Sequence, residues 1–289
     1  MSAREKALFL VRRLREEGYE AYLAGGSVRD DLLGRNPKDY DVATDARPEA
    51  VQKIFPRTVP VGTQFGVVLV VLEGETFEVA TFRFDGPYLD GRHPSNVRFG
   101  TLEEDVKRRD FTINGMMYDP LSERLIDLVG GKEDLARRRI RAIGEPRQRF
   151  EEDRLRMIRA VRLAASTDFT IEEGTFQALQ ELAPSITSVA WERIGEEITR
   201  LLTEGGARKG FQLLERTGLL EVVLPEVAAT KGVTTSKPSE LEPSPEVRRV
   251  QPSARQSARA AALRLLQPPE NFKFGCRRKH ACRFHFLSP

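Results

Sequence analysis

The sequence of 289 residues has only two cysteines, one tryptophan and three histidines. Both cysteines, Cys276 and Cys282, lie near the C-terminus, which excludes a disulfide framework and fits a reducing compartment. They also lack the short spacing of common zinc sites, so we expect no zinc even though His280 and His285 lie nearby.

Long apolar runs are absent as well. No run approaches the ~18 consecutive apolar residues of a membrane helix, and the N-terminal MSAREKALFLVRRLREEG is charged and helical in period, unlike a signal peptide. We therefore expect a cytoplasmic protein without a membrane partner. The length allows two domains, and the 40% hydrophobic and 31% charged residues are typical of a globular protein.

A glycine-containing turn lies at the start of the stretch LAGGSVRDDLLGRNPKDYDVAT, residues 23–44. A short apolar run ends at Gly25-Gly26, where a backbone without Cβ atoms can turn and approach a ligand closely. We expect Ser27 to cap the helix that follows, and Gly34 to end it. The amides at the helix start are predicted to hold phosphates.

Two aspartates follow in the same stretch. The segment DYDVA, residues 39–43, predicts a strand in which Asp39 and Asp41 point to one side and Tyr40 to the other. Two carboxylates this close repel each other unless a cation lies between them, and Mg²⁺ suits such oxygen ligands and brings phosphate oxygens with it. Alone, such a pair is usually solvated; beside the glycine turn it indicates phosphoryl or nucleotidyl transfer.

The combination of GGSVRD, LLGR, PKD and DxDVAT resembles the head domain of class II tRNA nucleotidyltransferases and bacterial poly(A) polymerases, within the polymerase-β-like superfamily. The resemblance implies an α+β fold: a small mixed sheet with helices on one side, followed by an all-helical neck. It implies transfer of CMP and AMP from CTP and ATP to the 3′ end of tRNA, with two Mg²⁺ ions held by Asp39 and Asp41. Gly25, Gly26, Ser27 and Arg29 would hold phosphates.

A third carboxylate is expected on a neighbouring strand. Residues 67–72 and 76–83 read as a hairpin. By resemblance, Glu78 in its second strand would position the metal and accept the proton of the primer hydroxyl. The alternative is a solvent-facing glutamate on an antiparallel sheet.

The segment DGPYLDGRHPSNVRFG, residues 85–100, is rich in glycine, proline and polar residues and predicts a surface loop. It resembles the flexible loop of CCA-adding enzymes, which helps to switch specificity from CTP to ATP. Asp85 and Arg92 are the candidate residues there, whereas His93 is interpreted as a loop residue.

Two further motifs carry charged residues. Arg108, Arg109 and Asp110 precede an apolar run, and a nucleotide requires both guanidinium groups for phosphate and a carboxylate for the ribose hydroxyls. RRDFTIN matches the second motif of the family, which is associated with selection of ribose. An ordinary surface cluster of ion pairs is the alternative.

The segment 149–162 predicts a helix with Leu155 and Ile158 buried and with Arg156, Arg159 and Arg162 along one side. Such a stripe is usually solvated or paired with acidic neighbours. Here it matches the E-D-x-x-R motif of the family at Glu152, Asp153 and Arg156, and we also assign Arg159 to the nucleotide site.

By that resemblance Asp153 and Arg156 read the base and Glu152 steadies Arg156. Cytosine and adenine both present an amino donor beside a ring-nitrogen acceptor. A carboxylate and a guanidinium complement this pair, whereas uracil and guanine present the reverse.

The resemblance extends to Val227 and includes the helix with Trp191, which we expect to be a core residue. From Ala228 onward the chain has 12 Lys and Arg against 4 Asp and Glu and few periodic apolar positions, so we expect a basic, poorly ordered tail. We predict a nucleotidyltransferase head at 1–145, a helical RNA-binding neck at 146–228 and the tail at 229–289. A shortened gene or a reading-frame change near Thr230 is a hypothesis for the loss of family character there.

Two alternatives stay open. One is a poly(A) polymerase of the same family, or a specialised CC-adding or A-adding enzyme; the other is a truncated nucleotide- or RNA-binding protein with little turnover. No protein partner is implied, and the sequence does not give the oligomeric state.

Overall fold

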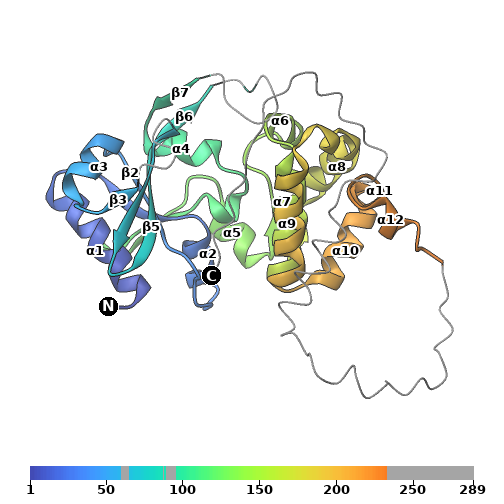
Figure 1. Ribbon diagram of the computed structural model, residues 1–289, viewed down its shortest axis with the longest axis horizontal. Helices are drawn as coiled ribbons and strands as arrows, with labels where there is room; N and C mark the ends of the chain where they lie inside the picture. The colour runs from blue at the N-terminus through green and yellow to red at the C-terminus, as the bar shows by residue number, and fades with distance from the viewer. Residues whose placement is uncertain (60–64, 87, 89–95, 233–289) are drawn as a thin grey trace, which may run out of the picture.

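The computed structural model describes residues 1–59, 65–86, 88 and 96–232. Within these ranges, one part of the molecule is built on a seven-stranded sheet and the other part is helical (Figure 1). No helix in these ranges is both long and apolar enough to cross a membrane. The predictions for Arg92, His93 and the C-terminal tail beyond residue 232 concern residues outside the described ranges.

The large sheet is mixed, with the strand order β3-β4-β5-β2-β1-β8-β9. Its strands are β1 (Ala21–Ala24), β2 (Asp41–Thr44), β3 (Thr58–Val59), β4 (Val67–Leu72), β5 (Glu75–Thr81), β8 (Met117–Asp119) and β9 (Arg124–Ile126). Only β2 and β5 pair in parallel; the other neighbours are antiparallel. The mixed sheet and the 67–72 hairpin strand confirm the predicted fold class.

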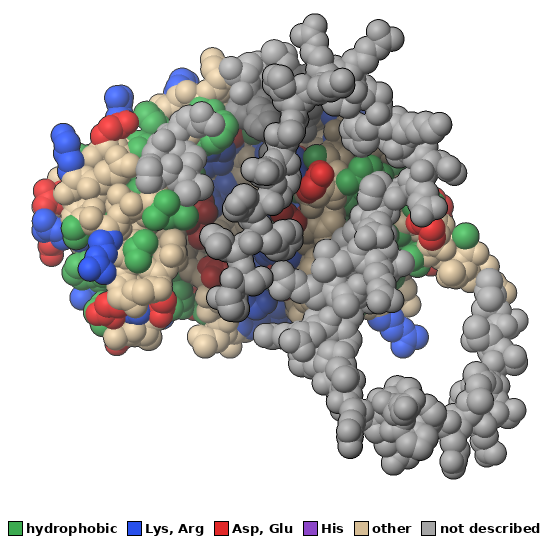
Figure 2. Space-filling model, in the orientation of Figure 1, with side chains coloured by type: hydrophobic (Ala, Val, Ile, Leu, Met, Phe, Trp, Pro, Cys, Tyr) green, Lys and Arg blue, Asp and Glu red, His purple; other side chains and the backbone are tan. Residues whose placement is uncertain are grey.

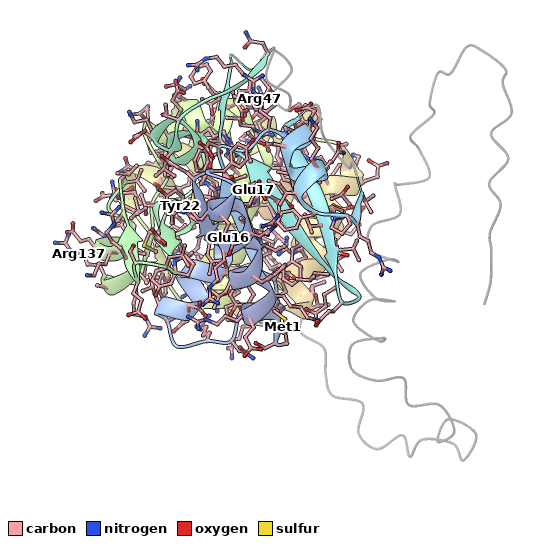
Figure 3. The ribbon with its side chains drawn as sticks, turned by 90° about the vertical axis from the view of Figure 1, so that its left-hand side faces the viewer. Met1, Glu16, Glu17, Tyr22, Arg47 and Arg137 are labelled. Carbon is pink, nitrogen blue, oxygen red and sulfur yellow. The ribbon has the colours of Figure 1, made fainter. Side chains whose placement is uncertain are left out.

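One face of the sheet is covered by the helices α1 (Ala3–Glu16) and α3 (Pro48–Ile54). Figure 3 looks onto this face, with α1 in front of the strands. Ser2 caps α1: its hydroxyl accepts from the amide of Glu5, and the Glu5 carboxylate accepts from the amide of Ser2. The helix buries Leu10 and Val11 against the apolar side chains of this face, each contributing about 1.5–3 kcal/mol.

The opposite face of the sheet is only partly covered. Helix α4 (Leu102–Arg108) packs beside the small hairpin of β6 (Arg83–Asp85) and β7 (Val97–Phe99) and buries Val106 with Phe82 and Ala43. After α4, the short helix η2 (Thr112–Asn114) leads into β8, and α5 (Gly131–Ala136) packs against η2. The uncovered part of this face borders the helical part of the molecule.

The helical part agrees with the predicted helical neck, apart from the two-residue strand β11 (Thr170–Ile171). Its elements are α6 (Pro146–Glu152), α7 (Leu155–Thr167), α8 (Glu173–Leu182), η3 (Ala183–Ser188), α9 (Trp191–Thr203), α10 (Ala207–Arg216), α11 (Leu219–Val223) and α12 (Pro225–Ala228). Helix α7 is central and contacts α6, α9 and α10. It buries Met157, Ile158 and Val161 completely, so its orientation is fixed by packing on several sides.

Two findings differ from the sequence-based expectations for this part. The segment 149–162 is two helices, because Asp153 is extended between α6 and α7 and its carboxylate accepts from the amide of Leu155. Trp191 is 47% exposed at the start of α9, so the prediction that it is a core residue is wrong. The apolar face of α9 consists of Ile194, Ile198 and Leu201 instead.

The two parts are connected beyond the peptide chain. The strand β10 (Arg139–Ile140) pairs in parallel with β11 (Thr170–Ile171), and the Arg35 guanidinium donates to the carbonyls of Ser166 and Thr167. These contacts cross the boundary predicted at residue 145, which stays a prediction.

Candidate active site

A cleft of about 690 Å³ lies between the uncovered face of the sheet and the helix α7. Figure 2 shows basic and acidic side chains together in the middle of this face of the molecule. Among the described residues, the cleft is lined by the arginines Arg83, Arg108, Arg109, Arg156, Arg159 and Arg193 and by the carboxylates Asp41, Glu78, Asp85, Asp110 and Asp153. Six cations against five anions suit a ligand with several negative charges and polar groups.

The sheet wall of the cleft carries two carboxylates next to the glycine turn. Val42 pairs with Val79 in the parallel pair β2–β5, so the preceding residues, Asp41 and Glu78, lie side by side. Gly25 has φ +70°, and a Cβ added to it would lie 3.3 Å from Oδ2 of Asp41. The turn therefore needs glycine, both for its backbone conformation and for its approach to the carboxylate.

The charge of this wall fits a divalent cation. Burial raises the pKa of Asp41 to about 6, with a further increase from Glu78 and a smaller one from Asp39, although Arg109 opposes them. An added cation would relieve this repulsion. Within the described ranges no group of three or more Asp, Glu, His or Cys side chains that could hold a metal ion is found.

Three residues from the first motif differ in detail from the predictions. Asp39 is exposed and precedes β2, which begins only at Asp41. Ser27 is not the cap: Gly25 is the N-cap of α2 (Gly26–Leu32), and the buried Ser27 hydroxyl donates to the Ala24 carbonyl. Arg29 forms a two-bond ion pair with Asp30 and donates to Asn114 at 2.8 Å, outside the residues that line the cleft.

The second motif brings its charged residues to the opposite wall. Arg108 and Arg109 are both bonded to the carboxylate of Asp105 and both line the cleft. Asp110 is buried and lies 2.9 Å from Arg159 of α7. Burial alone would raise the pKa of Asp110, but Arg159, the hydrogen bonds from the Phe111 amide and Asn114, and Arg156 together outweigh it and the pKa is lowered.

The third motif is held by a shared carboxylate. Glu152 accepts from Nη1 of Arg156 at 2.7 Å and also from Arg149. Arg149 in turn donates to the carbonyls of Arg108 and Arg109, which ties this motif to the second one.

Asp153 of the same motif lines the cleft and pairs with Arg193 of α9 at 3.0 Å. Helix α9 thus contributes a cation from a distant part of the chain to the position where we expect the base to be read.

The loop candidate Asp85 also lies at the cleft. It pairs with Arg83 at 2.9 Å and accepts from the Tyr88 hydroxyl at 2.8 Å. Burial and this bond raise the pKa of Tyr88 to about 12, and the Tyr88 ring lies 5.9 Å from the Arg156 guanidinium.

Two protein families match the chain. The poly(A) polymerase head domain matches residues 21–141, and the probable RNA- and SrmB-binding site of polymerase A matches residues 168–231. The chain is 45% identical over 216 residues to the CCA-adding enzyme of Geobacillus stearothermophilus, which covers 74% of this chain and 53% of that enzyme.

Solved structures of CCA-adding enzymes are also similar to this chain. The crystal structure of the Bacillus stearothermophilus CCA-adding enzyme in complex with CTP is 42% identical, with a TM-score of 0.70 over 76% of this chain and 53% of that one. The Thermotoga maritima CCA-adding enzyme complexed with tRNA is 26% identical, with a TM-score of 0.64 over 77% and 52%. The chain belongs to the tRNA nucleotidyltransferase and poly(A) polymerase family. It spans about half the length of the curated relatives it matches.

The nucleotidyltransferase motifs account for most, but not all, of the cleft. Sequence reasoning missed Arg83, Tyr88, Asn114 and Arg193, which line it, and Asp105, which holds two of its arginines. Asp105 had a signal in the sequence, because its spacing to Arg108 and Arg109 on a helix is i,i+3 and i,i+4, and Tyr88 and Asn114 lie in the loop segment and the RRDFTIN motif already singled out. Arg193 lies on a helix far along the chain, and nothing local indicates that it reaches the cleft.

Proposed function

We propose that this chain is a Mg²⁺-dependent nucleotidyltransferase that adds CMP and AMP from CTP and ATP to the 3′ end of tRNA, in the cytoplasm. The observation that carries the proposal is the cleft itself: Asp41 and Glu78 lie beside the Gly25 turn and face a wall of arginines. The names of the relatives, which are CCA-adding enzymes, support this choice of reaction.

The proposed step is an in-line displacement at phosphorus. The 3′ oxygen of the RNA forms a bond to the α-phosphorus of the nucleotide, and the bond from that phosphorus to the bridging oxygen breaks. Pyrophosphate leaves, and the hydroxyl proton passes to a carboxylate or to water. Asp39 and Asp41 would hold two Mg²⁺ ions, which when bound acidify the attacking hydroxyl and neutralise charge on the triphosphate.

The remaining charged residues have separate proposed roles. Glu78, which lies next to Asp41, would accept the proton or orient Asp41. Gly25 and Gly26 give the triphosphate close access to backbone amides, and Arg108 and Arg109 supply guanidinium groups for its oxygens. Asp110, ionised by its pairing with Arg159, accepts from the ribose hydroxyls.

Base selection is assigned to Asp153 and Arg156. Both line the cleft, and Nη1 of Arg156 donates a hydrogen bond of 2.7 Å to the Glu152 carboxylate. The Asp153 carboxylate accepts from the exocyclic amine of cytosine or adenine while Arg156 donates to the ring nitrogen, and uracil and guanine lack this pattern. The same protein groups therefore select two bases without a nucleic-acid template.

The test is incorporation into a tRNA that lacks its terminal CCA, with each nucleoside triphosphate supplied separately. We expect CMP incorporation first, AMP only after two CMP residues, and no incorporation of UMP or GMP. Asp41→Asn should abolish incorporation, whereas Asp45→Asn, just after the far end of the same strand and outside the cleft, should retain it.

Other results identify the alternatives. Efficient addition of AMP to any RNA would indicate a poly(A) polymerase. Binding of CTP and ATP by calorimetry, without incorporation into any RNA, would indicate a nucleotide-binding protein.

A further inference from the structure

A single buried carboxylate binds two of the arginines that line the cleft, Arg108 and Arg109. Asp105 of α4 is 1% exposed. Its Oδ1 accepts from Nε and Nη2 of Arg108 at 2.9 and 2.6 Å, and its Oδ2 accepts from Nε and Nη2 of Arg109 at 3.1 and 2.9 Å. Oδ1 also accepts from the backbone amide of Arg83 at 3.4 Å. Asp105 therefore contacts three of the arginines that line the cleft, Arg83 through its backbone and Arg108 and Arg109 through their side chains.

The pairing fixes the direction of both guanidinium groups. Each arginine uses the same edge, Nε and Nη2, on Asp105, so its Nη1 projects away from the carboxylate. In Arg109 this nitrogen lies toward the glycine turn: a Cβ added to Gly25 would be 3.7 Å from it. A guanidinium bound along one edge keeps few rotamers, so it is oriented before a ligand arrives.

The charge balance suits an anion. One carboxylate compensates only one of the two guanidinium groups, so the three side chains carry a net positive charge beside the cleft. Burial would raise the pKa of Asp105, but Arg109 and Arg108 outweigh it and lower the pKa, so Asp105 stays ionised at neutral pH.

We propose that Asp105 is a positioning residue for the triphosphate of the incoming nucleotide, acting through Arg108 and Arg109. The proposal rests on the proposed function, because it takes a nucleoside triphosphate as the ligand of the cleft. Asp105 itself does not touch the ligand; without it the two arginines keep their charge but lose their fixed direction.

The chain offers a matched control in Asp134. This carboxylate is also completely buried and also pairs with two arginines, Arg139 at 2.9 Å and Arg141 at 2.7 Å. Neither of these arginines lines the cleft. Replacement of Asp134 thus removes a comparable buried ion-pair cluster without changing the wall that faces the nucleotide.

The experiment compares Asp105→Asn, Asp105→Glu and Asp134→Asn with the wild-type chain. For Asp105→Asn we expect the Kd for CTP to rise about tenfold, as for one lost charge-assisted hydrogen bond, with a much smaller change for CMP and no change in the preference for CTP over UTP. Asp134→Asn should leave all three values unchanged even where it lowers the unfolding midpoint. Equal losses of CTP and CMP binding, or equal effects of Asp105→Asn and Asp134→Asn, would overturn the proposal.

A double-mutant cycle tests whether Asp105 acts through its arginines. In an Arg109→Ala background, Asp105→Asn should weaken CTP binding clearly less than in the wild type, whereas additive effects would contradict the proposal. If Asp105→Asn does not fold, Asp105→Glu, which keeps the charge but displaces the paired edge, must still raise the Kd for CTP; an unchanged value would refute the role. Since these are binding measurements, a wild-type chain that binds CTP but adds nothing to tRNA would refute the proposed function alone.

Discussion

Replacement of Glu152 by glutamine should lower base selectivity as well as stability. Glu152 accepts from Arg149 and from Arg156, which hold the second and third motifs together. The glutamine side chain has nearly the same shape, but its neutral oxygen forms weaker bonds to two cations. The substitution therefore perturbs the direction of Arg156 without opening a cavity.

The expected loss of stability depends on the hydrogen bonds that Arg149 and Arg156 keep in the variant. Hydrogen bonds to charged groups contribute about 1.5–3 kcal/mol and neutral ones about half of that. Two bonds are weakened, but Arg149 keeps the carbonyls of Arg108 and Arg109, Arg156 keeps the carbonyl of Arg149, and the Glu152 side chain is 18% exposed. We therefore expect a loss of about 2 kcal/mol in the free energy of unfolding.

Selectivity should fall by roughly tenfold, because about 1.4 kcal/mol of discrimination is lost when one of the two base contacts is misaligned. The assay is kcat/KM for CTP and for UTP on tRNA lacking CCA, together with urea unfolding.

The matched control is Glu197→Gln. Glu197 pairs at 2.6 Å with Arg162, which lies on the same helix as Arg156 and is equally buried, but outside the cleft. Glu197→Gln should cost similar stability and leave selectivity unchanged. If both variants lose selectivity alike, or if Glu152→Gln keeps it in full, the assignment of Arg156 to base reading fails.

Three further predictions follow from single positions. Gly25→Ala should abolish CTP binding, measured by calorimetry, and lower the free energy of unfolding, measured in urea, by about 1–3 kcal/mol. Gly34→Ala is the control, because Gly34 also has a positive φ but no atom lies near the added Cβ. It should lower stability and leave CTP binding unchanged. Although burial opposes them, Arg159 and the hydrogen bonds from the Phe111 amide and Asn114 together lower the pKa of Asp110 below 3.8 in the folded chain. This stabilisation is complete above that pH and is lost as the pH falls through the folded pKa, so Asp110→Asn should flatten the decline of the urea midpoint below pH 4. Trp191, the only tryptophan, should emit as a solvated indole that acrylamide quenches readily, and Trp191→Ala should change the free energy of unfolding by less than about 0.5 kcal/mol; a blue-shifted, protected emission would contradict its exposure.

Local sequence was sufficient to predict features that depend only on the residues of one segment. The helical period of residues 1–18 and the hairpin strands at 67–72 and 76–83 follow from spacing within one segment, whereas the position of Glu78 beside the strand of Asp41 came from the motif resemblance. The motif resemblance supplied the rest of the fold class, which periodicity alone would not have given.

The errors have physical causes that local sequence does not contain. The strand carrying Asp41 is shorter than predicted because its antiparallel partner, β1, begins its pairing at that residue, with Ala24 opposite Asp41. Ser27 has a hydroxyl suitable for a cap, but the glycine before it takes that position and the hydroxyl bonds to Ala24.

Residues that reach the cleft from distant parts of the chain could not be predicted, because local sequence does not show how the helices pack. Arg193 reaches the cleft because α9 packs on α7, which places its guanidinium 3.0 Å from Asp153. Trp191, two residues earlier, faces solvent because the buried face of that helix begins at Ile194. Such tertiary packing decides which of two neighbouring side chains enters a site.

The most direct test of the central claim is a crystal structure of this chain with a non-hydrolysable CTP analogue and Mn²⁺ in place of Mg²⁺. We expect anomalous density for the metal at the Asp41 carboxylate, with the triphosphate between that ion, the Gly25 turn and Arg109. Metal and triphosphate bound elsewhere, with Asp41 in contact with neither, would contradict it.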